Sequence, residues 1–230
     1  DRPARTRARR GTRGVKINYQ LAMERELAEI ARRERRPRLL LHSCCAPCSS
    51  AVLERLTDWF DLTVFYYNPN IAPEEEFLRR AEEQRRLIAE LPHAHEIQFR
   101  CGEYESEAFE ALARGLEDAP EGGERCTRCF RLRLGKTAAL AAREGFDYFT
   151  TTLSISPLKD AQRLNAIGGE LAEQFGVSYL FSDFKKKNGY KRSCELSLQY
   201  GLYRQDYCGC RFSQMEREKK KITEELSTDI

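Results

Sequence analysis

Short apolar runs alternate with stretches of helical periodicity along most of this chain, and the alternation limits the folds that it can adopt. Five apolar runs have the length and pattern of strands: 38–42, 62–67, 95–99, 147–151 and 177–181. Helices are predicted near 19–36, 51–56, 74–91, 104–116, 128–144, 160–175 and 194–203, with a charged helix at the C-terminal end. Such alternation is typical of a parallel sheet covered on both faces. The expected fold class is therefore α/β, with a parallel, doubly wound sheet of about five strands and flanking helices.

The residues most suited to chemistry follow the predicted strands. In an open parallel sheet, ligands bind outside the carboxyl ends of the strands. The cysteine-containing segment 44–48 comes directly after the first strand, and the Thr- and Ser-rich segment 150–157 ends the fourth. We therefore expect the functional site at this edge of the sheet.

Nine cysteines are unusual for 230 residues, and their clustering is more informative than their number. Seven of them fall into three tight groups: Cys44, Cys45 and Cys48; Cys126 and Cys129; Cys208 and Cys210. Cysteines of an ordinary core would be scattered, and no segment has the pattern of a secretory signal, so metal or redox chemistry is favoured over a disulfide scaffold. Cys101 and Cys194 stand alone and are interpreted as ordinary core or near-surface residues.

Two of the cysteine groups together supply four thiolates. The spacing of Cys126 and Cys129 is that of a metal-binding knuckle, whereas the adjacent Cys44 and Cys45 suit an iron-sulfur cluster better than a zinc knuckle. These four cysteines are therefore candidate ligands of a 4Fe-4S cluster. On spacing alone, a structural zinc site with the same four ligands is an equal alternative, and unmetallated thiols are a third interpretation.

Cys208 and Cys210 predict a different chemistry, because a single glycine separates them. Two thiols at this spacing close only a small, strained ring when oxidised, and strained disulfides are the labile, redox-active ones. The alternative is that both are further metal ligands. Cys48, at the expected amino end of a helix, is interpreted as a spare ligand or as a reactive thiol whose thiolate the helix dipole favours.

Basic residues are unevenly distributed. Residues 1–16 contain seven Arg and Lys residues and one Asp, a charge of +6, whereas the whole chain carries +3, so the remainder carries −3. This pattern predicts a basic flexible arm at 1–16, and Arg-rich segments can bind RNA phosphates. In the folded part, the candidates for RNA contacts are the loop 185–192, Arg131, Arg133 and Arg204. The longest apolar run, 138–142, is far shorter than the ~18 residues of a membrane span, so no membrane partner is expected.

Six motifs follow one another between Leu39 and Ser213. They are His42-Ser-Cys-Cys-Ala-Pro-Cys48, Tyr67-Asn-Pro-Asn-Ile71, Glu124-Arg-Cys-Thr-Arg-Cys-Phe130, Thr150-Thr-Thr-Leu-Ser-Ile-Ser-Pro157, Asp183-Phe-Lys-Lys-Lys187 and Tyr203-Arg-Gln-Asp-Tyr-Cys-Gly-Cys-Arg-Phe-Ser213. Together these motifs resemble those of the cobalamin-independent epoxyqueuosine reductase family, QueH. Residues 1–36 and those after 213 lie outside the resemblance.

The resemblance implies a cytoplasmic, tRNA-modifying oxidoreductase. Such an enzyme reduces the epoxide of epoxyqueuosine at the tRNA wobble position to queuosine, the last step of queuosine biosynthesis. The resemblance further implies a 4Fe-4S cluster on Cys44, Cys45, Cys126 and Cys129, and it allows for one additional iron ion. Cys208 and Cys210 would be the catalytic pair and form a redox-active disulfide. The implied partners are tRNA containing epoxyqueuosine and an electron donor that the sequence does not identify.

The resemblance also implies a Rossmann-like sheet that does not use ATP, because segment 44–48 carries cysteines where ATP-using tRNA enzymes carry Ser-Gly-Gly. The predicted division of the chain is a basic arm at 1–16, an N-terminal helix at 17–37, an iron-sulfur reductase domain at 38–213 and a charged helix or tail at 214–230.

Two other functions remain as alternatives. One is a zinc-stabilised RNA-binding module without catalysis, and the other is a tRNA thiolation enzyme, against which the absence of a phosphate-binding loop speaks. If the chain is a reductase, it also needs an active-site acid. The candidates are Tyr67, Asp206 and Tyr207, which lie in or beside the motifs.

Overall fold

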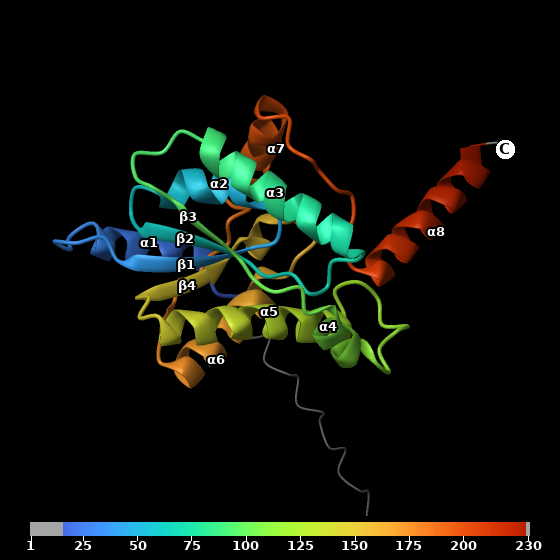
Figure 1. Cartoon of the computed structure of the whole chain (residues 1–230), viewed down its shortest axis with the longest axis horizontal. Coiled ribbons are helices and arrows are strands. Elements are labelled where there is room, and N and C mark those ends of the chain that lie inside the picture. The colour runs from blue at the N-terminus through green and yellow to red at the C-terminus, as the bar shows by residue number, and fades with distance from the viewer. Residues whose placement is uncertain (1–15, 229–230) are drawn as a thin grey trace, which may run out of the picture.

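A five-stranded parallel sheet forms the centre of the fold (Figure 1). The computed structural model describes residues 16–228. Its strands are β1 (Arg38–Ser43), β2 (Asp61–Tyr66), β3 (Gln98–Cys101), β4 (Tyr148–Thr151) and β5 (Ser178–Tyr179). They lie in the order β3-β2-β1-β4-β5, and every pairing is parallel. The winding therefore reverses beside β1, which confirms the predicted α/β, Rossmann-like architecture.

Helices cover both faces of this sheet. They are α1 (Tyr19–Ile30), α2 (Ala46–Leu56), α3 (Glu74–Glu90), α4 (Ser106–Ala113), α5 (Glu124–Arg143), α6 (Ala161–Phe175), α7 (Gly189–Gln199) and α8 (Arg211–Thr228), together with a short 3-10 helix, η1 (Thr152–Ile155). Figure 1 shows α2, α3 and α7 over one face, and α4, α5 and α6 over the other. Helix α8 projects from the body of the molecule.

The leucines of β1 show why this strand lies at the centre. Leu39 and Leu41 point to one face and pack with Leu53 of α2, whereas Leu40 points to the other face and packs with Leu134 of α5. All five are completely buried. A strand covered on both faces requires an unbroken apolar run, and this strand has one.

Several helix boundaries differ from the predicted ones. Asn18 caps α1 as expected, its side chain accepting a hydrogen bond from the Leu21 N–H, but the helix ends at Ile30 rather than at residue 36. The six residues after Ile30 contain only one apolar side chain, Ala31, so they have little surface to bury against the core. Helix α5 begins four residues earlier than predicted, at Glu124, and so places both cysteines of the 126–129 pair on the helix.

Other segments also differ from the expectations. Helix α7 begins five residues earlier than predicted, and the last strand is shortened to Ser178–Tyr179. The charged C-terminal helix was expected from residue 214 and begins at Arg211. Apart from Lys16, the predicted basic arm lies outside the described residues. Among the helices of 16–228, none has the length and apolar character needed to cross a membrane.

Candidate active site

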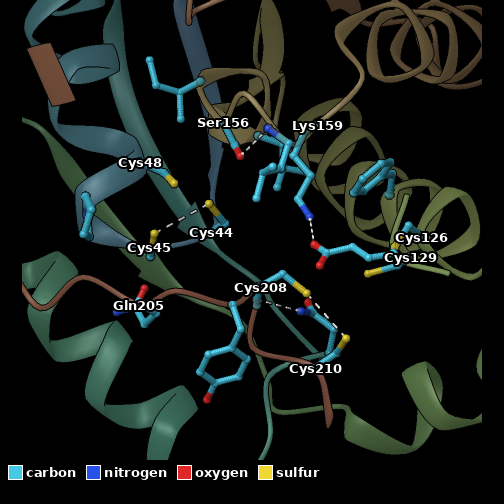
Figure 2. Close-up of a pocket in the computed structure, with 18 of the residues that line it drawn as sticks. Cys44, Cys45, Cys48, Cys126, Cys129, Ser156, Lys159, Gln205, Cys208 and Cys210 are labelled. Atoms are coloured by element: carbon cyan, nitrogen blue, oxygen red, sulfur yellow. Dashed lines mark hydrogen bonds and ion pairs between the residues drawn. The ribbon is translucent and has the colours of Figure 1, made fainter. Parts of the chain in front are cut away.

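A cavity of about 370 Å³ opens at the carboxyl ends of the strands. Its walls come from the amino ends of α2 and α5, from η1 with the segment that follows it, and from the segment that precedes α8. All seven clustered cysteines line it: Cys44, Cys45, Cys48, Cys126, Cys129, Cys208 and Cys210 (Figure 2). The cavity thus lies at the edge of the sheet where the sequence predicted a functional site. The two isolated cysteines, Cys101 and Cys194, are not among the lining residues.

The first cysteine group lies where β1 turns into α2. Cys45 is the residue before the helix, and Pro47 occupies its first turn. The sulfur atoms of Cys44, Cys45 and Cys48 all lie within 4.8 Å of one another, close enough to share a metal ion. Hydrogen bonds from Cys45, and then from Cys48, hold the pKa of Cys44 well below its usual value. The hydrogen bond between Cys44 and Cys45 is also the main cause that raises the pKa of Cys45 to about 12. The turn therefore stabilises one thiolate at Cys44 before any metal binds.

The second group lies on the first two turns of α5. Cys126 and Cys129 are both buried, and the backbone N–H of Gly122 donates to the Cys126 sulfur at 3.2 Å. Burial raises the pKa of both thiols, that of Cys129 to about 11. Figure 2 shows these two cysteines across the cavity from Cys44 and Cys45. The four predicted ligands thus line one cavity, while the group of three sulfur atoms within 4.8 Å of one another includes Cys48 together with Cys44 and Cys45.

The third group is a pair of free thiols on the segment that leads into α8. The sulfur atoms of Cys208 and Cys210 lie 3.5 Å apart. Their hydrogen bond is the main cause that lowers the pKa of Cys208 to about 5; burial opposes the shift, and the charge of Lys159 adds to it. The same contact raises the pKa of Cys210. At neutral pH the pair is therefore a thiolate beside a thiol, which is the reactive form for thiol-disulfide chemistry.

The turn between these two thiols is held by its backbone. The carbonyl of Gly209 accepts from the Ala72 N–H at 3.0 Å, and the Cys208 N–H donates to the Ser213 hydroxyl at 3.2 Å. Gly209 has a φ of +106°, and a Cβ atom at this position would lie 2.8 Å from Ile71 and 3.0 Å from the Arg80 guanidinium. Both the backbone conformation and the close approach therefore require glycine.

A partly buried ion pair beside the thiols is a feature that sequence reasoning missed. The Lys159 ammonium lies 2.9 Å from the Glu121 carboxylate, and Glu121 also accepts from the Ser213 hydroxyl at 3.3 Å. Burial alone would lower the pKa of Lys159, but the charges of Cys208 and Glu121 raise it above its usual value. Both residues come from loops, where charged side chains are usually solvated, so the sequence carried no signal that they converge.

The three candidate acids lie in different surroundings. Tyr207 and Asp206 line the cavity, whereas the hydroxyl of Tyr67 donates to Glu105 at 2.6 Å, and Tyr67 is not among the lining residues. Hydrogen bonds from Lys221 and Arg217 lower the pKa of Asp206, so it is a carboxylate at neutral pH. Burial raises the pKa of Tyr207, which keeps its hydroxyl protonated and makes it the acid that the geometry favours among the three.

The basic residues proposed for RNA binding do not form one free surface. Arg133, which the sequence predicted as an RNA contact, is instead buried, with only 4 % of its surface exposed. Helix α5 turns this side chain inward because Cys129 and Arg133 are four residues apart and share the buried face. Lys185 pairs with Asp183, and Arg131 pairs with Glu170.

A cavity lined by seven thiols at the switch point of a doubly wound sheet defines a cysteine-based metal or redox protein of the α/β class. A sequence model of the family described as "Epoxyqueuosine reductase QueH" matches residues 39–216. This chain belongs to that family.

Individual relatives agree with the family match. An epoxyqueuosine reductase QueH of Staphylococcus epidermidis is 42 % identical over 88 % of this chain and 87 % of its own length. One from Streptococcus pyogenes serotype M1 is 44 % identical over 85 % of this chain and 77 % of its own length. A third, from Thermotoga maritima, is 36 % identical over 79 % of this chain and 93 % of its own length.

The geometry of the Cys-Gly-Cys turn predicts the effect of a single methyl group. Gly209→Ala should lower the stability by about 1–3 kcal/mol and displace Cys208 relative to Cys210, because neither the positive φ nor the space suits a Cβ atom. Gly115→Ala is the matched control, since Gly115 has a φ of +73° but no atom within 4 Å of the place that a Cβ would take. Urea denaturation and the rate of disulfide formation would measure both effects. Equal rates in the two variants would contradict the prediction.

Proposed function

We propose that this chain reduces the epoxide of epoxyqueuosine in tRNA and forms queuosine, the activity for which its family is named. The observation that carries the proposal is the convergence of three thiol groups, far apart in sequence, on one cavity. A hydrolase would need an activated water and no thiol pair, whereas a reductase needs a place for two electrons. A zinc-stabilised RNA-binding module would not need the differing pKa values of Cys208 and Cys210. The proposed location of the protein is the cytoplasm, because its tRNA substrate would be found there.

The donor set of the cavity fits an iron-sulfur cluster. We assign the cluster to Cys44, Cys45, Cys126 and Cys129, which line the cavity from its two sides. Cys48 lies with the first two in the tight sulfur group and is the proposed ligand of one additional iron ion. Thiolates are the ligands that such clusters use, and when bound the cluster supplies electrons one at a time. The alternative occupant of the same thiolates is zinc.

The Cys208–Cys210 pair can supply the two electrons that the reaction needs. When the Cys208 thiolate and the Cys210 thiol form one S–S bond, they release two electrons and one proton. The epoxide takes up these two electrons and two protons, the second proton coming from an active-site acid that solvent reprotonates. Its two C–O bonds break, a C=C bond forms, and the oxygen leaves as water. An external electron donor then returns the disulfide to the dithiol. The low pKa of Cys208 makes it the reactive sulfur, and Cys210 follows as its partner.

Residues around the pair support the charge changes of this step. As the first C–O bond breaks, negative charge develops on the epoxide oxygen, and a fixed donor or cation in a partly dry pocket stabilises it. Lys159, held by Glu121, provides such a cation. Tyr207 also lines the cavity, is protonated at neutral pH because burial raises its pKa, and is the proposed proton donor.

The reaction itself is the first test of this function. Anaerobically prepared enzyme, incubated with epoxyqueuosine-containing tRNA and a low-potential electron donor, should yield a nucleoside that is one oxygen lighter. The product should require the donor and should not require cobalamin or ATP. Mass spectrometry of the digested tRNA measures it. A product one water heavier would identify an epoxide hydrolase and refute the proposal.

Alanine variants should separate the metal ligands from the redox pair. Cys126→Ala and Cys129→Ala should remove most of the bound iron and sulfide, because each deletes one ligand, and should abolish the brown colour. Cys208→Ala and Cys210→Ala should keep the iron content near that of the wild type but reduce turnover by at least about a hundredfold, since each removes half of the disulfide. Iron and sulfide analysis measures the first effect. Loss of iron in both of the latter variants would instead make that pair a ligand pair.

The structure also predicts which basic side chain contacts the tRNA. Lys186 follows the carboxyl end of β5, is exposed, and takes part in none of the ion pairs found among the described residues. Lys186→Glu should weaken tRNA binding and flatten the salt dependence of log K by about 0.7–0.9 per lost phosphate contact. Arg143→Glu is the control, because Arg143 lies at the opposite end of the sheet. Filter binding at several salt concentrations measures both, and equal slopes for the two variants would refute the contact.

A further inference from the structure

Four cationic side chains with little or no exposed surface line the cavity, and three of them form an ion pair with a carboxylate. Arg80 pairs with Glu76 at 2.6 Å, Lys159 with Glu121 at 2.9 Å, and Arg125 with Glu216 at 3.5 Å. The fourth is Arg133, which forms no ion pair with any carboxylate of residues 16–223, whose side chains the structure describes. It is also deeply buried, at 4 % exposure. A buried charge without a counter-ion is costly, so this position requires an explanation.

The groups that contact Arg133 do not supply the missing negative charge. Its guanidinium donates to the side-chain oxygen of Asn68, which is neutral, and lies 3.4 Å from the His42 ring. Burial, and then the charge of Arg133, lowers the pKa of His42 to about 3, so the ring is neutral as well. The His42 ring nitrogens are also 2.8 Å from the Thr151 hydroxyl and 3.1 Å from the Tyr67 carbonyl. Neutral partners therefore fix the guanidinium in place without balancing its charge.

The thiols are the remaining candidates for the balancing charge. Arg133 follows Cys129 by four residues on α5, and it lines the same cavity as Cys44. Its charge and a hydrogen bond oppose the effect of burial on the pKa of Cys129, and its charge helps to lower the pKa of Cys44. Arg133 thus lies on the helix that carries one pair of the proposed ligands, and its charge also acts on a thiol of the other pair.

We propose that Arg133 is the buried counter-charge of the thiolate-held centre, and that it raises the reduction potential of the cluster by balancing the negative charge on Cys44 and Cys129. The inference rests on the cofactor assigned under the proposed function. Reduction adds one negative charge to a centre that already carries thiolates, and a fixed cation in a poorly solvated place favours this change. Arg133 is a positioning and electrostatic residue; it is not one that reacts.

The test measures the reduction potential of the loaded protein in charge-removing and charge-keeping variants. At the midpoint potential of the wild type, Arg133→Met should show at least a tenfold lower ratio of reduced to oxidised cluster, which is a shift of about 59 mV for one electron. Arg133→Gln retains an amide donor for Asn68 and should shift in the same direction, so a folding defect in one variant does not decide the outcome. The ratio of reduced to oxidised cluster in Arg133→Lys should stay within about threefold of the wild-type ratio. Electron paramagnetic resonance during an anaerobic redox titration gives these ratios.

A second readout compares the melting temperatures of loaded and metal-free protein. Loading should stabilise Arg133→Met less than it stabilises the wild type, because the bound centre is then left without its counter-charge. Arg125→Met is the control: it removes another buried arginine of α5, but one that is already paired, and it should lower both melting temperatures alike. Normal iron and sulfide with an unchanged potential in both Arg133→Met and Arg133→Gln would overturn the inference. Wild-type protein that takes up zinc and no sulfide would overturn the cofactor assignment instead, and the inference with it.

Discussion

The pairing of β1 with β2 on one side and with β4 on the other determines where the cavity and the segments around it lie. The register places His42 opposite Phe65 of β2 and Thr151 of β4, so three strands end at the same level. From that edge the chain leaves β1 toward α2, and it leaves β4 toward η1 on the other side of the switch point. The cleft between these departures is the cavity, and the His42–Thr151 hydrogen bond at 2.8 Å links the two strands directly beneath it.

Much of this arrangement could be predicted from periodicity and from the rule for parallel sheets. The unbroken apolar run at 39–41 predicted a strand buried on both faces, and Asn18 predicted the start of α1, because local pattern and capping decide these features. The ends of helices were harder to predict. Cys126 and Cys129 were expected ahead of a helix or at its start, but the glycine-containing turn before residue 124 allows α5 to start earlier and to place both on its buried face. Tertiary burial decided that boundary, and it is invisible in local propensity.

The residues of the site also divide into those that the sequence could predict and those that it could not. Clustering along the chain is enough to find thiols that act together, and the cavity contains all seven of them. The charges around them come from single residues in unrelated segments: Glu121 precedes α5, Lys159 follows η1, and Arg133 sits one turn beyond Cys129. No spacing rule connects Glu121 and Lys159 with the thiols, because only the fold brings them together, whereas the four-residue spacing of Arg133 from Cys129 on α5 is a helical one. Arg133 shows the cost of assigning a role by charge alone, since an arginine in a basic helix proved to be a buried partner of neutral groups.

The order of the three thiol groups along the chain also sets an order in time. Cys44, Cys45, Cys48, Cys126 and Cys129 all precede β4, whereas the Cys-Gly-Cys turn comes after β5, when the sheet is complete. At about 5–20 residues per second, a ribosome makes the turn several seconds after the last of the other five cysteines. During that interval the turn does not yet exist, so it can neither compete for iron nor form disulfides with the earlier thiols. The chain order therefore makes the five thiols of the proposed metal site available before the sulfur pair that would react beside it.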